Sequence, residues 1–546
     1  MDFQKLGELL FPDTTLTRED MERRFPERRL PPGACVTRIG PSPTGFVHLG
    51  NLYNAIIGER LAHQSGGVFF LRIEDTDNKR EVDGAVQLVI DSMAHFGVRF
   101  DEGATSDGDA GNYGPYRQRQ RKEIYHVFAK WLVQNGFAYP CFLTAEELDA
   151  IREEQTARKE TTGFYGQYAE RSRGLTLDQI QKNLNEGKPW VLRYRGVMTE
   201  ESITVEDAIR GRLVMPRNDM DFVLLKSDGI PTYHFAHVID DHLMRSTHII
   251  RGEEWLPSLP MHVELFRVLG WTLPTYCHTA TLQKMEGSSR RKLSKRKDPE
   301  LGLSYYVQEG YSKDVLWEFL LTLLNSNYEE WRLANPEAAY LDFPFTLEKM
   351  ANSGALVDLE KLRSISKEVL CRTAPEKIYG EWLDWCKSYA PEYAALLERY
   401  RDRSLAALSV GKGGAKPRKD LETWKQACDF MSFYYDERFQ IYDAMPAEID
   451  EAARSSFFRD YLESLDFSDD SKAWFDKVKQ LTAAMGFAVR PKDYQKNPEQ
   501  YRGSIVHVTN MLRIALTGHA NAPDIWEVSR VLGEDIVRSR LTRWLD

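Results

Sequence analysis

The stretch that decides the fold is "CVTRIGPSPTGFVHLGNLYNAIIGERLAHQSGGVFFLRI", residues 35–73. Its first residues, "CVTRI", are β-branched and apolar enough to predict a buried strand, and "VFFLRI" predicts a second strand covered on both faces. The segment between them, "NLYNAIIGERLAHQSGG", has apolar residues at helical spacing and ends in two glycines. Strand, turn, helix and strand form a βαβ unit, so the sequence predicts a parallel sheet with right-handed crossovers.

The turn "PSPTGFVHLGN", residues 41–51, lies where a parallel sheet places its ligands. Helix N-termini point there, and their free backbone N–H groups and dipole favour phosphate. Gly45 and Gly50 allow the backbone to approach a nucleotide closely, and His48 is a candidate donor to a phosphate. The same composition also suits a plain tight connection with a surface histidine, so this turn alone does not decide between the two.

A second basic segment, "SSRRKLSKRK", occupies residues 288–297. One interpretation is a solvated basic loop. The other is a flexible loop whose lysines close over a triphosphate and neutralise the charge that develops as pyrophosphate leaves. Two phosphate-directed elements far apart in sequence favour one nucleotide site that is assembled from two halves of a fold.

Length and charge limit the class of protein. A chain of 546 residues exceeds what one core usually serves, so we expect three or more domains. No apolar run is long enough to cross a bilayer, and the start "MDFQKLGELLFPD" is too acidic for a signal peptide, which predicts a cytoplasmic protein without membrane contact. The net charge of −10 means that any polyanion must be bound by local basic patches.

The six cysteines are scattered, with no CxxC pair. Structural zinc needs closely paired ligands, and a disulfide framework needs an oxidising compartment. We therefore expect reduced thiols and no zinc.

Five segments carry a resemblance to a known family: "TRIGPSPTGFVHLG", "LRIEDTD", "PTYHFAHVIDDHLMRSTHIIRGEEWL", "KLSKR" and "LRIALTG". The first and fourth resemble the two signatures of class I aminoacyl-tRNA synthetases, and together the five resemble the glutamyl-tRNA synthetases. The resemblance runs from about Val36 to near the C-terminus. It implies an α/β Rossmann-type catalytic domain with an α/β insertion, followed by all-α C-terminal domains.

The activity implied by the resemblance is an ATP-dependent ligase reaction in two steps. The α-carboxylate of L-glutamate attacks ATP and gives glutamyl-adenylate and pyrophosphate, and the terminal ribose hydroxyl of tRNA(Glu) then takes the glutamyl group. Mg²⁺ would accompany ATP through its phosphates. The resemblance also implies a monomer that activates glutamate only with tRNA bound. Some relatives hold zinc with paired cysteines near "AYPCFLT", where this chain has only Cys141, which again predicts no zinc.

Positions that match the family's glutamate contacts come first. Arg38 and Arg251 match residues that hold the substrate, as a guanidinium fork suits a carboxylate. Structural ion pairs with nearby carboxylates are the alternative for both. Ser42, Glu74 and Tyr233 match further contacts, and Glu74 would receive the substrate ammonium, whereas Asp75 and Asp77 could simply cap the next helix.

The nucleotide side of the site follows from the two signatures. His48 and Gly50 in the first, and Lys292 and Lys295 in the second, match ATP-binding positions, with His48 and Lys295 in catalytic roles. Two further positions that match the cleft lining are Glu254 and Trp255, although packing is an equal interpretation of the tryptophan.

Two positions depart from the family pattern. Asn51 stands where the class signature often has a second histidine, and we assign it no catalytic role. His237 stands where the family often supplies an asparagine to the substrate. An imidazole can titrate near neutrality, so His237 is expected to change substrate affinity or its pH dependence.

The remaining organisation is predicted as six segments. These are an N-terminal extension (1–32), the first half of the catalytic domain (33–130), a connective insertion for the tRNA acceptor end (131–215), the second half (216–300), a helical stem-contact domain (301–370) and a helical anticodon-binding domain (371–546). Residues 409–420 predict a flexible basic connection, and Arg438 is a candidate base reader.

The predicted helical C-terminal half argues against two related families. Glutaminyl-tRNA synthetases carry β-barrel anticodon domains, and short glutamylating paralogues lack such a domain, so neither fits. Glutaminyl transfer, a nucleotidylyltransferase with a similar phosphate turn, and a tRNA-binding module without catalysis remain the rival functions.

Overall fold

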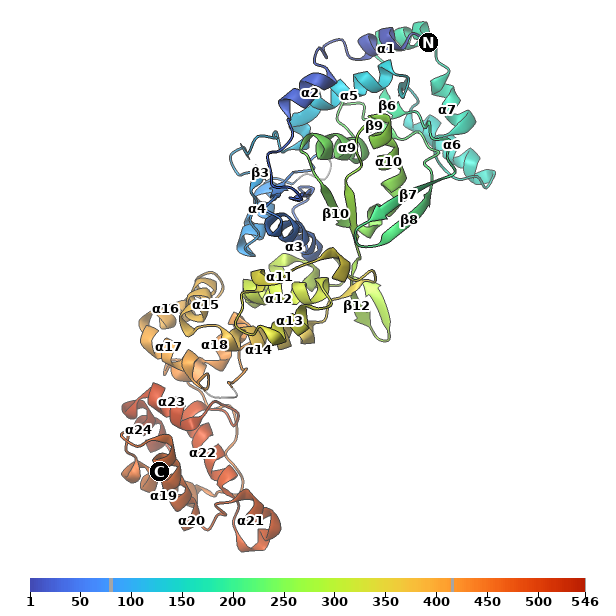
Figure 1. The fold of residues 1–546 in the computed structure, drawn as a ribbon. Helices are drawn as coiled ribbons and strands as arrows, with labels where there is room; N and C mark the ends of the chain where they lie inside the picture. Colours follow the sequence, from blue (N-terminus) through green and yellow to red (C-terminus); the bar gives the residue numbers. More distant parts are fainter. Residues whose placement is uncertain (78–81, 414–416, 546) are drawn as a thin grey trace. The chain divides into compact units, whose positions relative to one another are not determined.

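The computed structural model describes residues 1–77, 82–413 and 417–545. Contacts divide the chain into two compact units, one made of Met1–Tyr305 and Leu320–Asp358 and the other of Tyr306–Phe319 and Leu359–Asp546 (Figure 1). All strands of the described residues lie in the first unit. The finer division into six segments stays a prediction.

The predicted βαβ unit is confirmed. It consists of β1 (Val36–Ile39), α3 (Leu49–Gln64) and β2 (Val68–Leu71), and the two strands are parallel, with Val36 opposite Val68. The turn between α3 and β2 is very tight, because a Cβ on Gly67 would lie 1.9 Å from the carbonyl oxygen of Cys35. Only glycine fits there, and the preceding Gly66 has a positive φ of 69°, a backbone conformation that ends the helix.

A second set of strands continues the sheet on the other side of β1. β10 (His248–Gly252) pairs in parallel with β11 (Thr275–Thr279), which pairs in parallel with β7 (Ser202–Asp207). The Thr247 N–H donates to the Val36 carbonyl oxygen at 2.9 Å, so β10 lies beside β1. Strand β3 (Glu102–Ala104) follows β2 in parallel, and the spatial order is therefore β3, β2, β1, β10, β11, β7. From β1 the chain continues outward to β2 and β3, and from β10 it continues outward to β11 on the other side, so β1 and β10 flank a switch point, where such sheets bind ligands.

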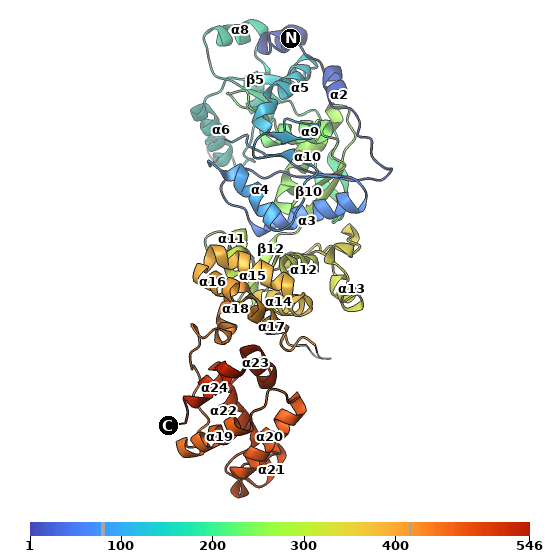
Figure 2. The same ribbon diagram turned by 90° about the vertical axis from the view of Figure 1, so that its left-hand side faces the viewer.

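Helices pack around this sheet. α9 (Tyr233–Leu243) contacts α10 (Leu259–Val268), and α5 (Lys122–Gln134) contacts α9. The expected helical N-terminal segment forms α1 (Phe3–Leu10) and α2 (Arg18–Arg24), which both lie against α5 (Figures 1 and 2). The N-terminal segment is thus part of the same folded unit as the sheet.

A smaller antiparallel sheet contains β5 (Ala138–Cys141), β6 (Val191–Tyr194) and β9 (Val223–Leu225). Its core packs Tyr139 and Cys141 against Ile151, Phe164 and Tyr168. The other elements of the first unit are α4 (Ala85–His95), β4 (Asp109–Ala110), α6 (Ala145–Ala157), α7 (Gly166–Arg173), α8 (Leu177–Asn185), β8 (Gly211–Pro216), α13 (Tyr328–Ala334), and the 3₁₀ helices at Gln118–Arg121, Glu253–Ser258, Pro299–Leu301, Tyr340–Asp342 and Leu347–Lys349.

The basic segment 288–297 differs from the irregular loop that was expected. Residues Ser289–Lys292 form strand β13, which pairs with β12 (Leu282–Glu286) as an antiparallel hairpin, and β14 (Ala355–Leu356) lies parallel to β12. The hairpin ladder fixes the first half of the basic segment.

The second unit is helical, as predicted for the C-terminal half. Two helices, α11 (Leu303–Glu309) and α12 (Lys313–Leu324), have residues in both units. The others are α14 (Leu359–Arg372), α15 (Pro375–Tyr389), α16 (Pro391–Arg399), α17 (Arg401–Ser409), α18 (Trp424–Phe430), α19 (Glu451–Ser464), α20 (Ser471–Ala484), α21 (Pro491–Lys496), α22 (Ile505–Thr517), α23 (Ile525–Leu532), α24 (Glu534–Thr542) and the 3₁₀ helices Ser432–Tyr434 and Pro498–Gln500.

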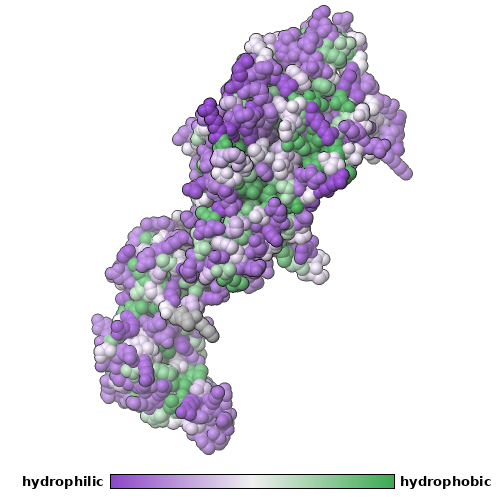
Figure 3. Space-filling model, in the orientation of Figure 1, coloured by the Kyte–Doolittle hydropathy of each residue, from purple (hydrophilic) through white to green (hydrophobic). Residues whose placement is uncertain are grey.

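The surface of each unit is largely hydrophilic on the face that Figure 3 shows, with hydrophobic residues scattered between polar ones. Among the described residues, no helix has both the length and the apolar character needed to cross a membrane. Part of the predicted flexible connection, residues 414–416, lies outside the described residues.

Candidate active site

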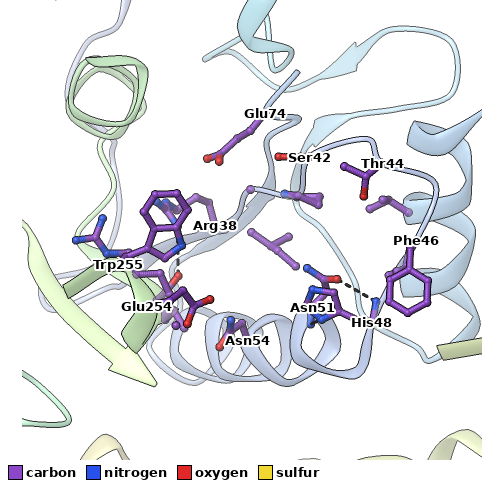
Figure 4. Close-up of a pocket in the computed structure, with 18 of the residues that line it drawn as sticks. Arg38, Ser42, Thr44, Phe46, His48, Asn51, Asn54, Glu74, Glu254 and Trp255 are labelled. Atoms are coloured by element: carbon purple, nitrogen blue, oxygen red, sulfur yellow. Dashed lines mark hydrogen bonds between the residues drawn. The ribbon is translucent and has the colours of Figure 1, made fainter. Parts of the chain in front are cut away.

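A cavity of about 290 Å³ opens at the switch point between β1 and β10 (Figure 4). Its wall is formed by the carboxyl ends of both strands, the 41–51 turn and the start of α3. Most of the residues predicted from sequence line it: Arg38, Ser42, His48, Glu74, Tyr233, Arg251, Glu254, Trp255 and Lys295.

A second cavity of about 290 Å³ adjoins the first. The two share the lining residues His48, Asn54, Gly252, Glu254 and Lys295. The second cavity also contains Gly50 and Lys292, the remaining predicted nucleotide-binding residues. The two phosphate-directed elements of the sequence therefore meet at one composite site.

The two sets of predicted residues lie at different ends of the first cavity. In Figure 4, Arg38, Glu74 and Trp255 lie at one end, whereas Phe46 and His48 lie at the other. Arg38 and Glu74, two of the predicted glutamate contacts, are thus separated from His48 within one cavity.

His48 is fixed in place by Asn51 at the start of α3. The His48 N–H donates to Asn51 Oδ1 at 3.0 Å, and the Asn51 N–H donates to His48 Nδ1 at 3.2 Å. This reciprocal pair is a capping box. Because Nδ1 accepts, the proton of a neutral imidazole is on Nε2, and burial together with the charges of Lys295 and Lys292 lowers the pKa of His48 to about 4. His48 is therefore an uncharged donor at neutral pH.

The basic segment 288–297 and the residues that follow it contact the 41–51 turn. The Leu303 N–H donates to the Val47 carbonyl oxygen at 3.1 Å, and the Lys295 ammonium lies 4.3 Å from the centre of the Phe46 ring. These contacts place the Lys295 side chain at the end of the cavity that His48 lines.

A buried carboxylate, Asp298, pairs with one of the cations of the basic segment. Arg291 forms a bidentate pair with Asp298 at 2.6 and 2.8 Å, and this hydrogen bonding, aided by the Ser294 N–H, lowers the pKa of Asp298. Asp298 thus balances the charge of Arg291. The cations of the segment that line the cavities are Lys292 and Lys295.

Arg38 forms a structural ion pair with a carboxylate, which was the alternative prediction for this residue. The residue is 5% exposed, and its guanidinium donates to both carboxylate oxygens of Asp241 at 2.9 Å, while Arg72 donates to the same carboxylate at 2.7 Å. Burial alone would raise the pKa of Asp241, but Arg38 and Arg72 hold it well below its usual value. Arg38 therefore lines the cavity with a charge that is already balanced.

Glu74 faces the same end of the cavity. It accepts a hydrogen bond from Arg72 at 2.9 Å, and burial raises its pKa. A Cβ on Gly40 would lie 2.3 Å from Glu74 Oε1, so any larger residue at the strand end would displace the Glu74 carboxylate. Asp75 does not cap the following helix as expected: α4 is N-capped by Gly84 without a side-chain bond, and Asp75 accepts the Arg119 backbone N–H at 2.9 Å.

Arg251 has a different environment from Arg38. The residue is also 5% exposed, but its guanidinium donates to two imidazoles, His278 Nε2 at 3.0 Å and His262 Nδ1 at 3.1 Å. Within the described residues no carboxylate pairs with it, and its Nη2 has no hydrogen-bond partner. Arg251 thus carries an unbalanced positive charge at the cavity wall.

Tyr233 and Trp255 form an aromatic wall. Their ring centres are 4.1 Å apart, so packing accounts for much of the tryptophan's position even though it lines the cavity. His237 stacks behind Tyr233 at 5.6 Å and lines neither cavity.

The expectation that His237 titrates near neutrality is wrong. The side chain is fully buried, with Nδ1 2.5 Å from Asp241 and Nε2 3.1 Å from the Tyr276 hydroxyl. Burial lowers its pKa to about 3. His237 is therefore a neutral part of the layer beneath the cavity.

Sequence reasoning missed the residues of that layer. Asp241, which balances Arg38, lies in the quoted segment "HFAHVIDDHL", where two adjacent aspartates interrupt an apolar helix. That interruption is a signal of buried charge that could have been used. Nothing local marks His262 or His278, because their role depends on pairing between distant strands and helices.

Two other predictions concern places outside the cavity. Arg438 lies in the second unit, where it pairs with Glu392 at 3.3 Å, and its role as a base reader stays a prediction. Among the described residues no group of three or more His, Cys, Asp or Glu side chains is arranged to hold a metal ion. All six cysteines are free thiols.

The fold and site define a class. A switch-point cavity on a Rossmann-like sheet, with the histidine turn and the lysine loop on its wall, accords with the match of residues 34–363 to the tRNA synthetases class I (E and Q) catalytic domain. Residues 501–545 match an anticodon binding domain.

Relatives narrow the class. The chain is 52% identical to a glutamate–tRNA ligase of Acetivibrio thermocellus and 44% identical to one of Clostridium perfringens, in both cases over 100% of each chain. A crystal structure of a glutamate tRNA ligase from Elizabethkingia meningosepticum in complex with its amino acid is 27% identical, with a TM-score of 0.73 over 94% of this chain and 99% of that one. The chain belongs to the glutamate–tRNA ligase family.

Proposed function

We propose that this protein activates L-glutamate with ATP and transfers it to the 3′ end of tRNA(Glu). The observation that carries the proposal is the pair of adjoining cavities that share His48 and Lys295, one with an unbalanced arginine and the other with lysines. Such a space suits an acidic amino acid beside a polyphosphate. Holding both in a reactive geometry and neutralising charge supply most of the expected acceleration.

The glutamate end would recognise two groups of the substrate. Arg251, with Arg38 beside it, would hold the side-chain carboxylate, since guanidinium groups form strong charge-assisted hydrogen bonds. Glu74 would accept the ammonium group, and Ser42 and Tyr233 would complete the wall.

The phosphate end acts on ATP. His48 Nε2–H would donate to a phosphate as a neutral group, and the backbone at Gly50 would allow close approach. Lys292 and Lys295 would neutralise the charge that grows on the leaving pyrophosphate. Mg²⁺ would arrive with ATP, bound mainly by phosphates and water.

The second step needs tRNA. The match of residues 501–545 to an anticodon binding domain supports anticodon binding by the helical unit, with Arg438 as a candidate reader. We further propose a monomer that acts in the cytosol without zinc; free cysteines suit a reducing compartment.

A charging assay tests this function. The protein is incubated with ATP, purified tRNA(Glu) or tRNA(Gln), and labelled glutamate or glutamine. We expect glutamyl-tRNA(Glu) with release of AMP and pyrophosphate, and the tRNA(Gln) arm shows whether the second tRNA is also used. Charging with glutamine alone, or nucleotidyl transfer without an aminoacyl ester, would overturn the proposal.

A further inference from the structure

Four buried side chains and the partly buried His234 form a continuous chain of hydrogen bonds through Arg251. Asp207 Oδ2 lies 2.6 Å from His278 Nδ1, and Arg251 Nε donates to His278 Nε2 at 3.0 Å. On the other side Arg251 Nη1 lies 3.1 Å from His262 Nδ1, and His262 Nε2 lies 3.0 Å from His234 Nδ1. The chain therefore runs Asp207–His278–Arg251–His262–His234.

The donor and acceptor roles along this chain follow from Arg251 and Asp207. A guanidinium can only donate, so His278 Nε2 and His262 Nδ1 must both accept. The proton of His278 is then on Nδ1 and is donated to the Asp207 carboxylate, which also accepts the His278 backbone N–H at 3.1 Å. Asp207 fixes the tautomer of His278.

The same reasoning applies to His262. With Nδ1 accepting from Arg251, its proton is on Nε2 and is donated to His234 Nδ1. His262 and His278 are fully buried, and burial lowers the pKa of each below its ordinary value. Both imidazoles are therefore neutral acceptors.

Arg38 provides the internal contrast. Arg38 and Arg251 line the same cavity and are equally buried, but a carboxylate balances Arg38 whereas two neutral imidazoles hold Arg251. The two imidazoles fix the position of the Arg251 guanidinium by hydrogen bonds without adding a negative charge. The Nη2 group of Arg251 is buried and has no hydrogen-bond partner among the described residues, and the Arg251 side chain lies next to Tyr233 in the cavity wall.

We propose that His278 and His262 are positioning residues that hold Arg251 through uncharged acceptors, and that the charge they leave unbalanced makes the site prefer glutamate to glutamine. An anionic side chain gains from a buried guanidinium that lacks a counter-ion, whereas a neutral amide gains far less. This inference rests on the proposed function of Arg251 as the residue that contacts the substrate side chain.

A matched pair of variants at His262 tests the inference. His262→Gln replaces the imidazole by a neutral acceptor, and His262→Glu places a carboxylate of the same size against Arg251. The groups that act electrostatically on His262 are histidines and Arg251, so a new carboxylate there has a cationic partner. KM and kcat for glutamate and glutamine are measured in tRNA-dependent pyrophosphate exchange, with the KM for ATP and thermal unfolding as checks on folding.

We expect His262→Gln to raise the KM for glutamate by only about fivefold, and His262→Glu to raise it by about 100-fold, with kcat and the KM for ATP little changed. The KM for glutamine should be similar in the two variants. The preference for glutamate over glutamine as substrate would then fall by more than about tenfold in His262→Glu and not in His262→Gln. Equal preference in both variants would overturn the inference.

Two further measurements keep the outcomes separate. Arg251→Gln tests the underlying function: if the KM for glutamate does not rise, the proposed role of Arg251 is wrong, whatever His262 does. The ¹⁵N shifts of histidine-labelled unmutated protein test the tautomers without any variant. Doubly protonated His262 or His278 at pH 7 would contradict the uncharged acceptors.

Discussion

The two ends of the cavity differ in whether their charged side chains are buried and hydrogen-bonded or exposed. At the glutamate end, Arg38 and Arg72 are buried and both donate to the Asp241 carboxylate, and Arg251 is held by imidazoles. At the phosphate end, Lys292 and Lys295 are exposed at the cavity edge. Lys295 contacts the Phe46 ring, and no ion pair to either lysine is found among the described residues.

This difference matches the two tasks of the site. Choosing an amino acid requires fixed groups whose geometry and charge do not adjust to the wrong substrate, and a buried network supplies them. Charge that builds up on a departing pyrophosphate requires cations that can follow it, and lysine side chains with three rotatable donors suit that task. Substitutions at the two ends should therefore fail in different ways.

The largest effect is expected at Asp241. Asp241→Asn removes the carboxylate that balances two buried arginines, and breaking a buried pair from one side typically costs about 3–5 kcal/mol of the free energy of unfolding. Because Arg38 loses its anchor, the KM for glutamate should also rise by about tenfold or more. Denaturant unfolding and pyrophosphate exchange measure the two effects.

Asp240→Asn is the matched control for Asp241→Asn. Asp240 is equally buried and pairs with Arg121 at 2.6 Å, but neither residue lines the cavities. It should destabilise the fold by a comparable amount and leave the KM for glutamate within about twofold. A rise in that KM equal to the one in Asp241→Asn would mean that general destabilisation, not the Arg38 anchor, is responsible.

Lys295→Ala should show the opposite pattern. Removing one group that stabilises developing charge typically lowers the rate by about 10²–10³-fold, so kcat for pyrophosphate exchange should fall by that factor. The unfolding free energy should change by less than about 0.5 kcal/mol, since Lys295 is exposed.

Lys297→Ala controls for the charge of the loop. Lys297 is exposed in the same segment but lines neither cavity, so exchange should stay within about twofold of the unmutated protein. Equal losses of exchange activity in Lys295→Ala and Lys297→Ala would mean that Lys295 acts only through the overall positive charge of the loop.

Sequence reasoning was most successful where local pattern decides structure. The βαβ unit could be predicted because Gly67 and the apolar runs on each side of α3 act within one short segment. The positions that line the cavities, such as Arg251 and Lys295, came from motifs. What balances those charges could not be predicted, because Asp241 and His278 reach them only through the pairing of strands and helices far apart in sequence.

Two contacts of the site could not be predicted for the same physical reason. His237 looked able to titrate because its neighbours were unknown, and the pairing of Asp298 with Arg291 in the basic segment was not apparent from the sequence. Both concern how far a charge or an imidazole is removed from water. Burial of this kind is set by tertiary packing, which a single sequence does not specify.

The smallest effect concerns His48, which belongs to both ends of the comparison because it is fixed by a capping box yet faces the phosphate end. Its folded pKa of about 4 lies below the unfolded value of 6.5, so between these pH values the unfolded chain binds a proton that the folded protein does not. Stability from this histidine is therefore fully present above pH 6.5 and is lost as the pH falls towards 4. His48→Asn keeps a good N-cap and removes the titration.

We expect His48→Asn to match the unmutated protein in unfolding free energy at pH 7.5 and to exceed it by about 1 kcal/mol at pH 5.5, as measured by urea unfolding. Asn51→Ala is the complementary control, because it removes one hydrogen bond of the box and leaves the imidazole. It should lose about 1 kcal/mol at both pH values. If the difference between His48→Asn and the unmutated protein does not change with pH, His48 is not held neutral by burial, and the proposed uncharged donor at the phosphate end must be abandoned.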